Sequence, residues 1–217
     1  MFLFFLLGLL VTVYIINKIY FGKTTIDHLR KELDKTKKIY KNVLPSLVHW
    51  SDQEIELLSY HVSGLSERKG FGQSIRGVFT SIYQENMLVF QHRPNDSKKK
   101  NGYTILISEG HEIIIDGKNQ VYVNGEILGL INKKNQFVNP KLRRNFGFLE
   151  EERFNKHNLI SEDKEILGAV KNPEDWELPF PRALELYQPL DDHYRLLLKI
   201  LCGHQMVKIY ADHLNNK

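Results

Sequence analysis

The sequence predicts an α+β protein: an N-terminal transmembrane helix and a juxtamembrane helix, followed by an antiparallel β-meander or barrel-like domain with a C-terminal apolar helix. Three observations indicate this fold class. An uncharged apolar run opens the chain, short strand-like runs separated by glycine dipeptides occupy its centre, and an apolar segment of helical length closes it.

We predict five parts from these patterns. They are a transmembrane anchor over 1–21, a basic juxtamembrane helix over 22–50, a short helix and linker over 51–69, an antiparallel β-domain over 70–178, and a C-terminal helix over 179–217 packed on the β-domain.

The opening run is long enough to span a bilayer. Residues 2–21 contain only Asn17 and Lys18 as strongly polar members, and as a helix they extend about 30 Å. No basic segment precedes the run and no small-residue cleavage site follows it, which favours a single-pass signal-anchor over a removable signal peptide. Basic residues gather on its C-terminal side, so we expect the N-terminus outside and the body in the cytoplasm. The alternative is an apolar helix buried in the protein core.

The positive charge of the chain is local. The net charge is +4, but residues 17–44 hold eight basic and three acidic residues, which leaves residues 45–217 with a charge of −1. This distribution favours contact with the lipid bilayer surface, and no nucleic acid is expected. A polar loop near residue 98 adds basic residues that could meet anionic lipid, although a solvated hairpin loop is the commoner explanation for them. The predicted membrane-surface contacts are Lys18, Lys23, Arg30, Lys31, Lys98, Lys99 and Lys100.

Apolar residues recur at heptad spacing in the basic helix, with Thr36 at one of the seven positions. One interpretation is a coiled coil through residues 26–47 that makes a homo-oligomer or binds a protein partner. The other is a single amphipathic helix that lies on its own domain or on lipid headgroups. Pro45 ends or kinks the helix. The predicted oligomerisation residues are Ile26, Leu29, Leu33, Tyr40, Val43 and Leu47.

The sequence pattern of the central region predicts an antiparallel meander. Ser51 to Glu54 has the form of a capping box and predicts a short helix over about 51–63. Beyond Gly70, Asp116-Gly117 and Asn124-Gly125 are strong hairpin signals. The sequence Glu-Ile-Leu-Gly occurs at 126–129 and again at 165–168, which predicts two strands with a glycine at a bulge or at a close backbone approach.

The C-terminal segment predicts a helix that is surrounded by protein. Asp191 or Asp192 can cap a helix running to about Leu214. Apolar residues cover most of its circumference, while several charged residues argue against a second membrane span. Cys202 lies in this apolar run and is expected to act as a small buried hydrophobe.

A meander with repeated Glu-Ile-Leu-Gly units and a C-terminal apolar helix resembles the tubby C-terminal-like group, which includes the LURP-one-related and phospholipid-scramblase-like proteins. The resemblance covers about residues 70–217. It implies a β-barrel that encloses the helix, and a membrane-associated domain that contacts lipid headgroups or protein partners. It carries over no catalytic residues.

Catalytic signatures are sparse in the sequence. The nine histidines lack ligand spacing, so no metal site is predicted, and no cofactor motif is present. Asp116 and Lys118 resemble the core of PD-(D/E)xK metal-dependent nucleases, but they also fit a hairpin turn. We therefore expect a non-enzymatic protein whose β-domain binds a protein partner or anionic lipid headgroups. The alternatives are a structural subunit of a membrane complex and a membrane-tethered nuclease.

Overall fold

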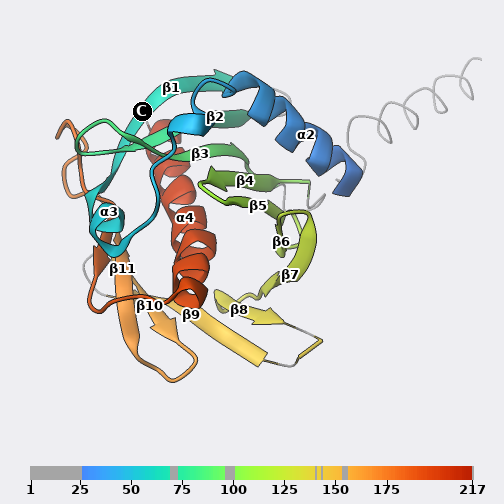
Figure 1. The fold of residues 1–217 in the computed structure, drawn as a ribbon, viewed down its shortest axis with the longest axis vertical. Helices are drawn as coiled ribbons and strands as arrows, with labels where there is room; N and C mark the ends of the chain where they lie inside the picture. The colour runs from blue at the N-terminus through green and yellow to red at the C-terminus, as the bar shows by residue number, and fades with distance from the viewer. Residues whose placement is uncertain are drawn as a thin grey trace, which may run out of the picture.

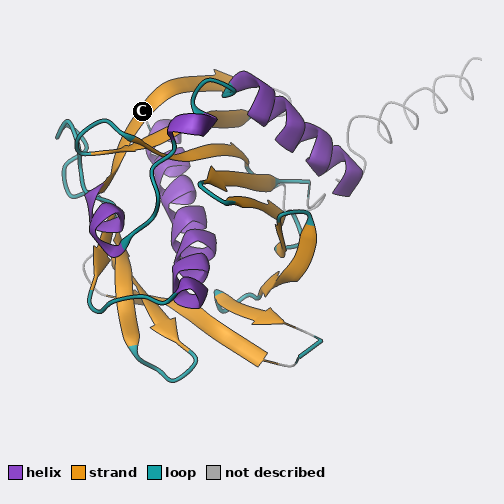
Figure 2. Cartoon of the chain, in the orientation of Figure 1, coloured by secondary structure: helices purple, strands orange, loops and turns teal. Residues whose placement is uncertain are grey.

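The computed structural model describes residues 26–68, 73–95, 101–139, 141–142, 144–152 and 156–216. These residues contain a twelve-stranded antiparallel sheet in which each strand pairs with the next along the chain (Figures 1 and 2). The helices are α2 (Ile26–Ile39), the 3-10 helix η1 (Leu44–Ser46), α3 (Asp52–Leu57) and α4 (Asp192–Asn215). The strands are β1 (Leu58–Arg68), β2 (Ser74–Ser81), β3 (Asn86–Arg93), β4 (Tyr103–Ser108), β5 (His111–Asp116), β6 (Gln120–Val123), β7 (Glu126–Ile131), β8 (Gln136–Asn139), β9 (Arg144–Glu152), β10 (Lys156–Ser161), β11 (Ile166–Lys171) and β12 (Leu184–Leu186).

The first strand meets the segment that leads into the last strand. Ser59 forms a β-bridge with Arg182. On either side of this bridge, Tyr60 N donates to the Pro181 carbonyl and Ala183 N donates to the Leu58 carbonyl, each at 2.9 Å. The meander therefore curls into a barrel, and Figure 1 shows its strands arranged around α4.

Helix α4 fills the interior of the barrel. The Asp191 side chain accepts a hydrogen bond from Tyr194 N at 2.7 Å, which caps the helix as the sequence predicts. Inside, the Phe79 and Phe90 rings stack with their centroids 4.5 Å apart, and both present edges to Tyr210 of α4. Because protein surrounds the helix, its apolar residues are spread around the circumference rather than along one stripe.

A second apolar layer lies outside the barrel, beneath α2. The strands between β2 and β6 are covered on both faces, so their residues are buried whichever way they point. In β4, Ile105 and Ile107 belong to the outer layer, whereas Leu106 belongs to the core around α4. This double cover explains why β4 is a continuous apolar run rather than an alternating pattern.

The two Glu-Ile-Leu-Gly segments form the same local structure, in β7 and in β11. In each, the pairing register shifts at the leucine, which marks a β-bulge just before the glycine. A Cβ atom added to Gly129 would lie 2.5 Å from the Val138 carbonyl oxygen, and one added to Gly168 would lie 2.5 Å from that of Glu185. The predicted bulge and the predicted close backbone approach are both confirmed.

The short helix is shorter than the sequence predicts. Ser51 Oγ accepts from Glu54 N at 3.3 Å, as in a capping box, but α3 ends at Leu57 rather than near residue 63. Residues from Leu58 onward pair with β2 and with the segment before β12, and these pairings override the local helical pattern. The strands therefore extend from residue 58 to 186, beyond the expected limits of 70 and 178.

The part of the chain that the structure describes has no helix that is both long enough and apolar enough to cross a membrane. Helix α2 is charged on its exposed face, and α4 carries Arg195, Lys199 and Lys208. This finding contradicts three predictions: the fold class with an N-terminal transmembrane anchor, the single-pass signal-anchor assignment, and the cytoplasmic placement of the body. Residues 1–21, on which those predictions were based, lie outside the described residues.

We predict that Gly129→Ala and Gly168→Ala each lower the free energy of unfolding by about 2–3 kcal/mol, because the added methyl group overlaps a backbone carbonyl that cannot move alone. Urea denaturation measures the effect. Gly110→Ala is the control: that turn glycine has a φ of +74° with nothing within 4 Å of an added Cβ, so only about 1 kcal/mol of backbone strain is expected. Equal losses at all three positions would contradict the explanation.

Candidate functional site

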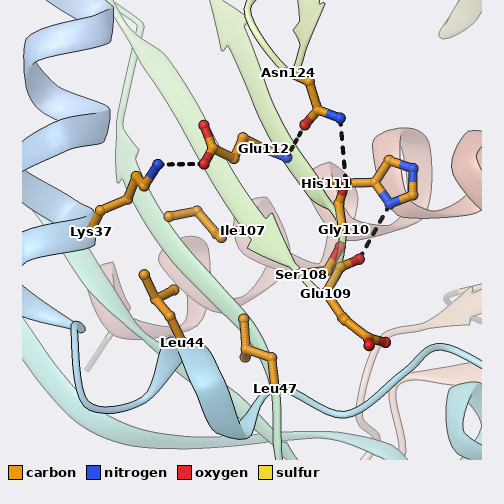
Figure 3. A pocket seen from close by; sticks show the side chains of 10 residues that line it. All are labelled: Lys37, Leu44, Leu47, Ile107, Ser108, Glu109, Gly110, His111, Glu112 and Asn124. Carbon is orange, nitrogen blue, oxygen red and sulfur yellow. Dashed lines mark hydrogen bonds and ion pairs between the residues drawn. The ribbon is translucent and has the colours of Figure 1, made fainter.

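A groove lies between the α2–η1 segment and the β4–β5 turn (Figure 3). Its volume is about 500 Å³, and it is open to solvent. We call it the α2 groove. It is lined by Lys37, Leu44, Leu47, Ile107, Ser108, Glu109, Gly110, His111, Glu112 and Asn124.

The floor of the α2 groove is apolar. Leu44 and Leu47 are half-buried and lie beside Ile107, which is buried in the layer beneath α2. Pro45 sits at the start of η1, where a proline is tolerated because the first turn of a helix needs no donor there. The turn carries the chain away from α2 and sets both leucines in the floor of the groove.

Polar contacts hold the rim in place. Lys37 Nζ of α2 lies 2.5 Å from Glu112 Oε1 of β5, and this pair joins the two walls of the groove (Figure 3). Asn124 uses both ends of its amide: Oδ1 accepts from Glu112 N at 2.8 Å, and Nδ2 donates to the Gly110 carbonyl at 3.3 Å. The β6–β7 turn is thereby bound to the β4–β5 turn. The rim thus has a defined shape before any ligand arrives.

A buried lysine lies behind the groove. The His111 ring extends from the groove edge (Figure 3), and its Nδ1 lies 3.2 Å from Lys199 Nζ of α4. The same ammonium group lies 5.5 Å from the centroid of the Trp50 ring. Only 3% of Lys199 is exposed, and it forms no ion pair with a carboxylate among the described residues.

Burial has a large effect on the protonation of this pair. Loss of hydration lowers the pKa of Lys199 to about 8; the Arg195 charge adds to the shift, and Glu109 and Asp192 oppose it. Burial, followed by the Lys199 charge, also lowers the pKa of His111. A neutral His111 with its proton on Nε2 can therefore accept a hydrogen bond from Lys199 through Nδ1; with its proton on Nδ1 it donates to the Glu109 carbonyl at 3.3 Å instead. The contact joins α4 to the start of β5.

The predicted oligomerisation residues pack on the chain's own sheet. Leu29, Leu33 and Tyr40 are buried in the layer beneath α2, and Ile26, Val43 and Leu47 are partly buried against it. This arrangement corresponds to the single amphipathic helix lying on its own domain. A coiled coil through these residues would first have to remove α2 from the sheet.

A polar network explains Thr36, the exception in the heptad. Its Oγ1 donates to Gln91 Oε1 at 2.7 Å, and Gln91 Nε2 donates to Tyr103 Oη and to Glu32 Oε2. Burial raises the pKa of Glu32, but bonds from Lys35, Gln91 and Tyr103 outweigh it, so the pKa is lowered overall. The threonine is thus the partner of a buried glutamine on β3.

The structure describes two of the seven predicted basic contacts. Arg30 and Lys31 are exposed on α2. Lys18 and Lys23, and the loop residues Lys98, Lys99 and Lys100, lie outside the described residues.

Asp116 and Lys118 form a hairpin turn between β5 and β6. Asp116 Oδ1 accepts hydrogen bonds from Lys118 N and Gln120 N, each at 2.8 Å. Within the described ranges, no three histidine, cysteine, aspartate or glutamate side chains are grouped to hold a metal ion. The geometry therefore assigns Asp116 a structural task in the turn. Cys202 is buried in α4, and burial raises the pKa of its thiol.

Sequence reasoning missed the α2 groove and the Lys199–His111 pair. Both depend on segments that are distant in the chain, because the contact between Lys199 and His111 spans 88 residues. One signal was present: a lysine inside the apolar run of the C-terminal helix must find a partner wherever that helix is buried.

We predict that Lys199→Met raises the free energy of unfolding at pH 7 by about 1–3 kcal/mol, since one pKa unit is worth about 1.4 kcal/mol. The folded-state pKa is depressed from 10.5 to about 8, so the unfolded chain binds more protons between these values and the stability of the unmodified protein rises with pH across that window. The variant lacks this rise. Urea denaturation between pH 7 and 10 measures it.

The control is Lys31→Met, at an exposed position on α2. Its stability curve should follow that of the unmodified protein at each pH. If Lys199→Met also follows that curve, the lysine is not desolvated in the folded state.

Comparison with known proteins gives no matching family model, no similar curated protein and no similar solved structure. Proposals for the function of this chain therefore rest on its residues and their geometry.

Proposed function

We propose that this chain is a non-enzymatic binding domain whose α2 groove accepts an apolar side chain from a protein partner. The observation that carries the proposal is the pair of half-buried leucines, Leu44 and Leu47, in the floor of a groove with a fixed polar rim. An apolar floor with a few oriented polar groups is the usual composition of a binding site.

The position of the groove supports an external partner. Helix α4 occupies the barrel interior, so a ligand has access only to the outer surface and the barrel ends. The groove is open to solvent, whereas sites for small molecules enclose most of their ligand. A peptide segment of a partner suits an open groove, because one anchor side chain enters the floor while its flanks contact the rim.

The lining supports binding rather than catalysis. Lys37 and Glu112 neutralise each other, and Asn124 is committed to two backbone groups. These side chains supply shape and hydrogen bonds. An activated nucleophile needs an adjacent base within hydrogen-bonding distance, and the groove offers no such pair among its described lining residues.

The alternatives have less support. A structural subunit that assembles through the heptads needs residues that are buried beneath α2. A nuclease that uses Asp116 and Lys118 needs a carboxylate that already serves two backbone donors of its turn.

We also propose a relationship to the tubby C-terminal-like group. The arrangement that supports it is a barrel of antiparallel strands around a C-terminal helix, with both Glu-Ile-Leu-Gly segments at bulges. The relationship stays a proposal, since no compared protein matches the chain.

Selection of a random peptide library on the purified full chain tests the binding proposal. We expect the enriched peptides to share one large apolar residue and to bind Leu47→Asp at least about tenfold more weakly, because the carboxylate removes the apolar floor. Leu142→Asp is the matched control, at a leucine that is 67% exposed outside the groove.

Circular dichroism and thermal unfolding check that each variant is folded, and Lys37→Glu, which repels Glu112 and opens the rim, provides a second disruption of the same groove. Peptides that bind Leu47→Asp and Lys37→Glu as tightly as the unmodified chain would overturn the proposal, as would a selection that enriches no peptide.

A further inference from the structure

A second pocket lies at the opposite end of β4 from the α2 groove. The groove includes Ser108 at the C-terminal end of this strand, whereas the second pocket includes Tyr103 at its start. We call it the end pocket. Its volume is about 270 Å³, and its walls come from the β3–β4 connection, the β5–β6 turn and α4.

Two cationic side chains line the end pocket. Neither the Arg93 side chain of β3 nor the Lys208 side chain of α4 forms an ion pair or a hydrogen bond with another described residue, and both residues are partly buried. Burial lowers the pKa of Lys208, while Asp212, one turn further along α4, opposes the shift. A cation that is partly removed from water and is not bonded to a carboxylate is costly, and an anion beside it offsets that cost.

Two histidines form the inner wall, and each is more than nine-tenths buried. His92 Nδ1 lies 2.9 Å from Thr104 Oγ1, whereas His204 Nδ1 has no hydrogen-bond partner among the described residues. Burial and the nearby Lys208 charge lower the pKa of His92 to about 4. Burial, followed by the Lys208 and His92 charges, lowers the pKa of His204 well below its usual value. Both rings are therefore neutral at pH 7 and can serve as hydrogen-bond donors.

The net charge of the pocket selects the ligand class. Asp116 also lines the pocket, with one carboxylate oxygen occupied by the two backbone donors of its turn. Among the described lining residues, Arg93 and Lys208 against Asp116 leave one unit of positive charge; Asp212, which acts on Lys208 from the next turn of α4, does not line the pocket. One negative charge balances this wall, while a second would meet repulsion from Asp116.

We propose that the end pocket binds a small organic monocarboxylate. The carboxylate pairs with Arg93 and Lys208, and the organic part contacts Ile115 and the Tyr103 ring, which also line the pocket. The volume lies just below the range typical of drug-sized ligands, which limits the organic part to a single small ring or a short chain. This site is separate from the α2 groove and does not depend on the function proposed for that groove.

Titration calorimetry on the full chain tests the proposal with benzoate as the probe, benzamide as its neutral counterpart and inorganic phosphate as a dianion. We expect benzoate to bind, benzamide to bind at least about tenfold more weakly, and phosphate to bind more weakly than benzoate. Arg93→Met and Lys208→Met should each weaken benzoate binding about tenfold, while Lys208→Arg retains most of it because the charge is kept.

Lys118→Met is the control, because Lys118 lies in the adjacent turn and its side chain does not line the pocket. It should leave benzoate affinity unchanged. Equal affinity for benzoate and benzamide, tighter binding of phosphate than of benzoate, or benzoate binding that survives both Arg93→Met and Lys208→Met would each overturn the proposal.

Discussion

The packing of α4 against the inner face of the sheet is the interaction on which the rest of the fold depends. A barrel of twelve short strands would enclose a large void if nothing filled it, and α4 supplies buried side chains around its whole circumference. At Gly203 the helix comes close to β4, where an added Cβ would lie 3.2 Å from Leu106 Cδ1. The inward residues of the strands and the residues of α4 thus form one core, so neither is stable without the other.

The same constraint determines where chemistry is possible. Since the interior is occupied, polar groups of α4 meet solvent or a ligand only near the ends of the barrel. Lys199 lies near the β4–β5 turn, and His204 and Lys208 lie near the opposite end, beside the β5–β6 turn. A purely structural helix would gain by replacing these groups with apolar ones, because burial disfavours the charged forms of both lysines. Their positions place the charged groups of α4 at the two ends, with Lys199 behind the α2 groove and Lys208 in the end pocket.

Local signals in the sequence predicted much of the secondary structure. The Asp191 cap, the turns at Asp116-Gly117 and Asn124-Gly125, and the bulges at Gly129 and Gly168 each depend on a few adjacent residues, so the sequence could reveal them. The start of β1 could not be found in this way, because Leu58 is held by β2 and by a segment more than 120 residues away. The closure of the barrel, the α2 groove and the end pocket also depend on such distant contacts.

The heptad pattern of α2 is compatible with two kinds of packing. The apolar stripe of the helix must be covered by another apolar surface, which either a second helix or a sheet can supply. Thr36 favours the sheet, since its hydroxyl lies 2.7 Å from Gln91 Oε1 of β3 as well as 2.8 Å from the Glu32 carbonyl of its own helix, and a coiled coil would keep only the second contact. The network continues through Tyr103 to Glu32, so detaching α2 would break these hydrogen bonds and expose the apolar residues beneath the helix together. This shared cost holds α2 on the barrel, and with it the wall that gives the α2 groove its shape.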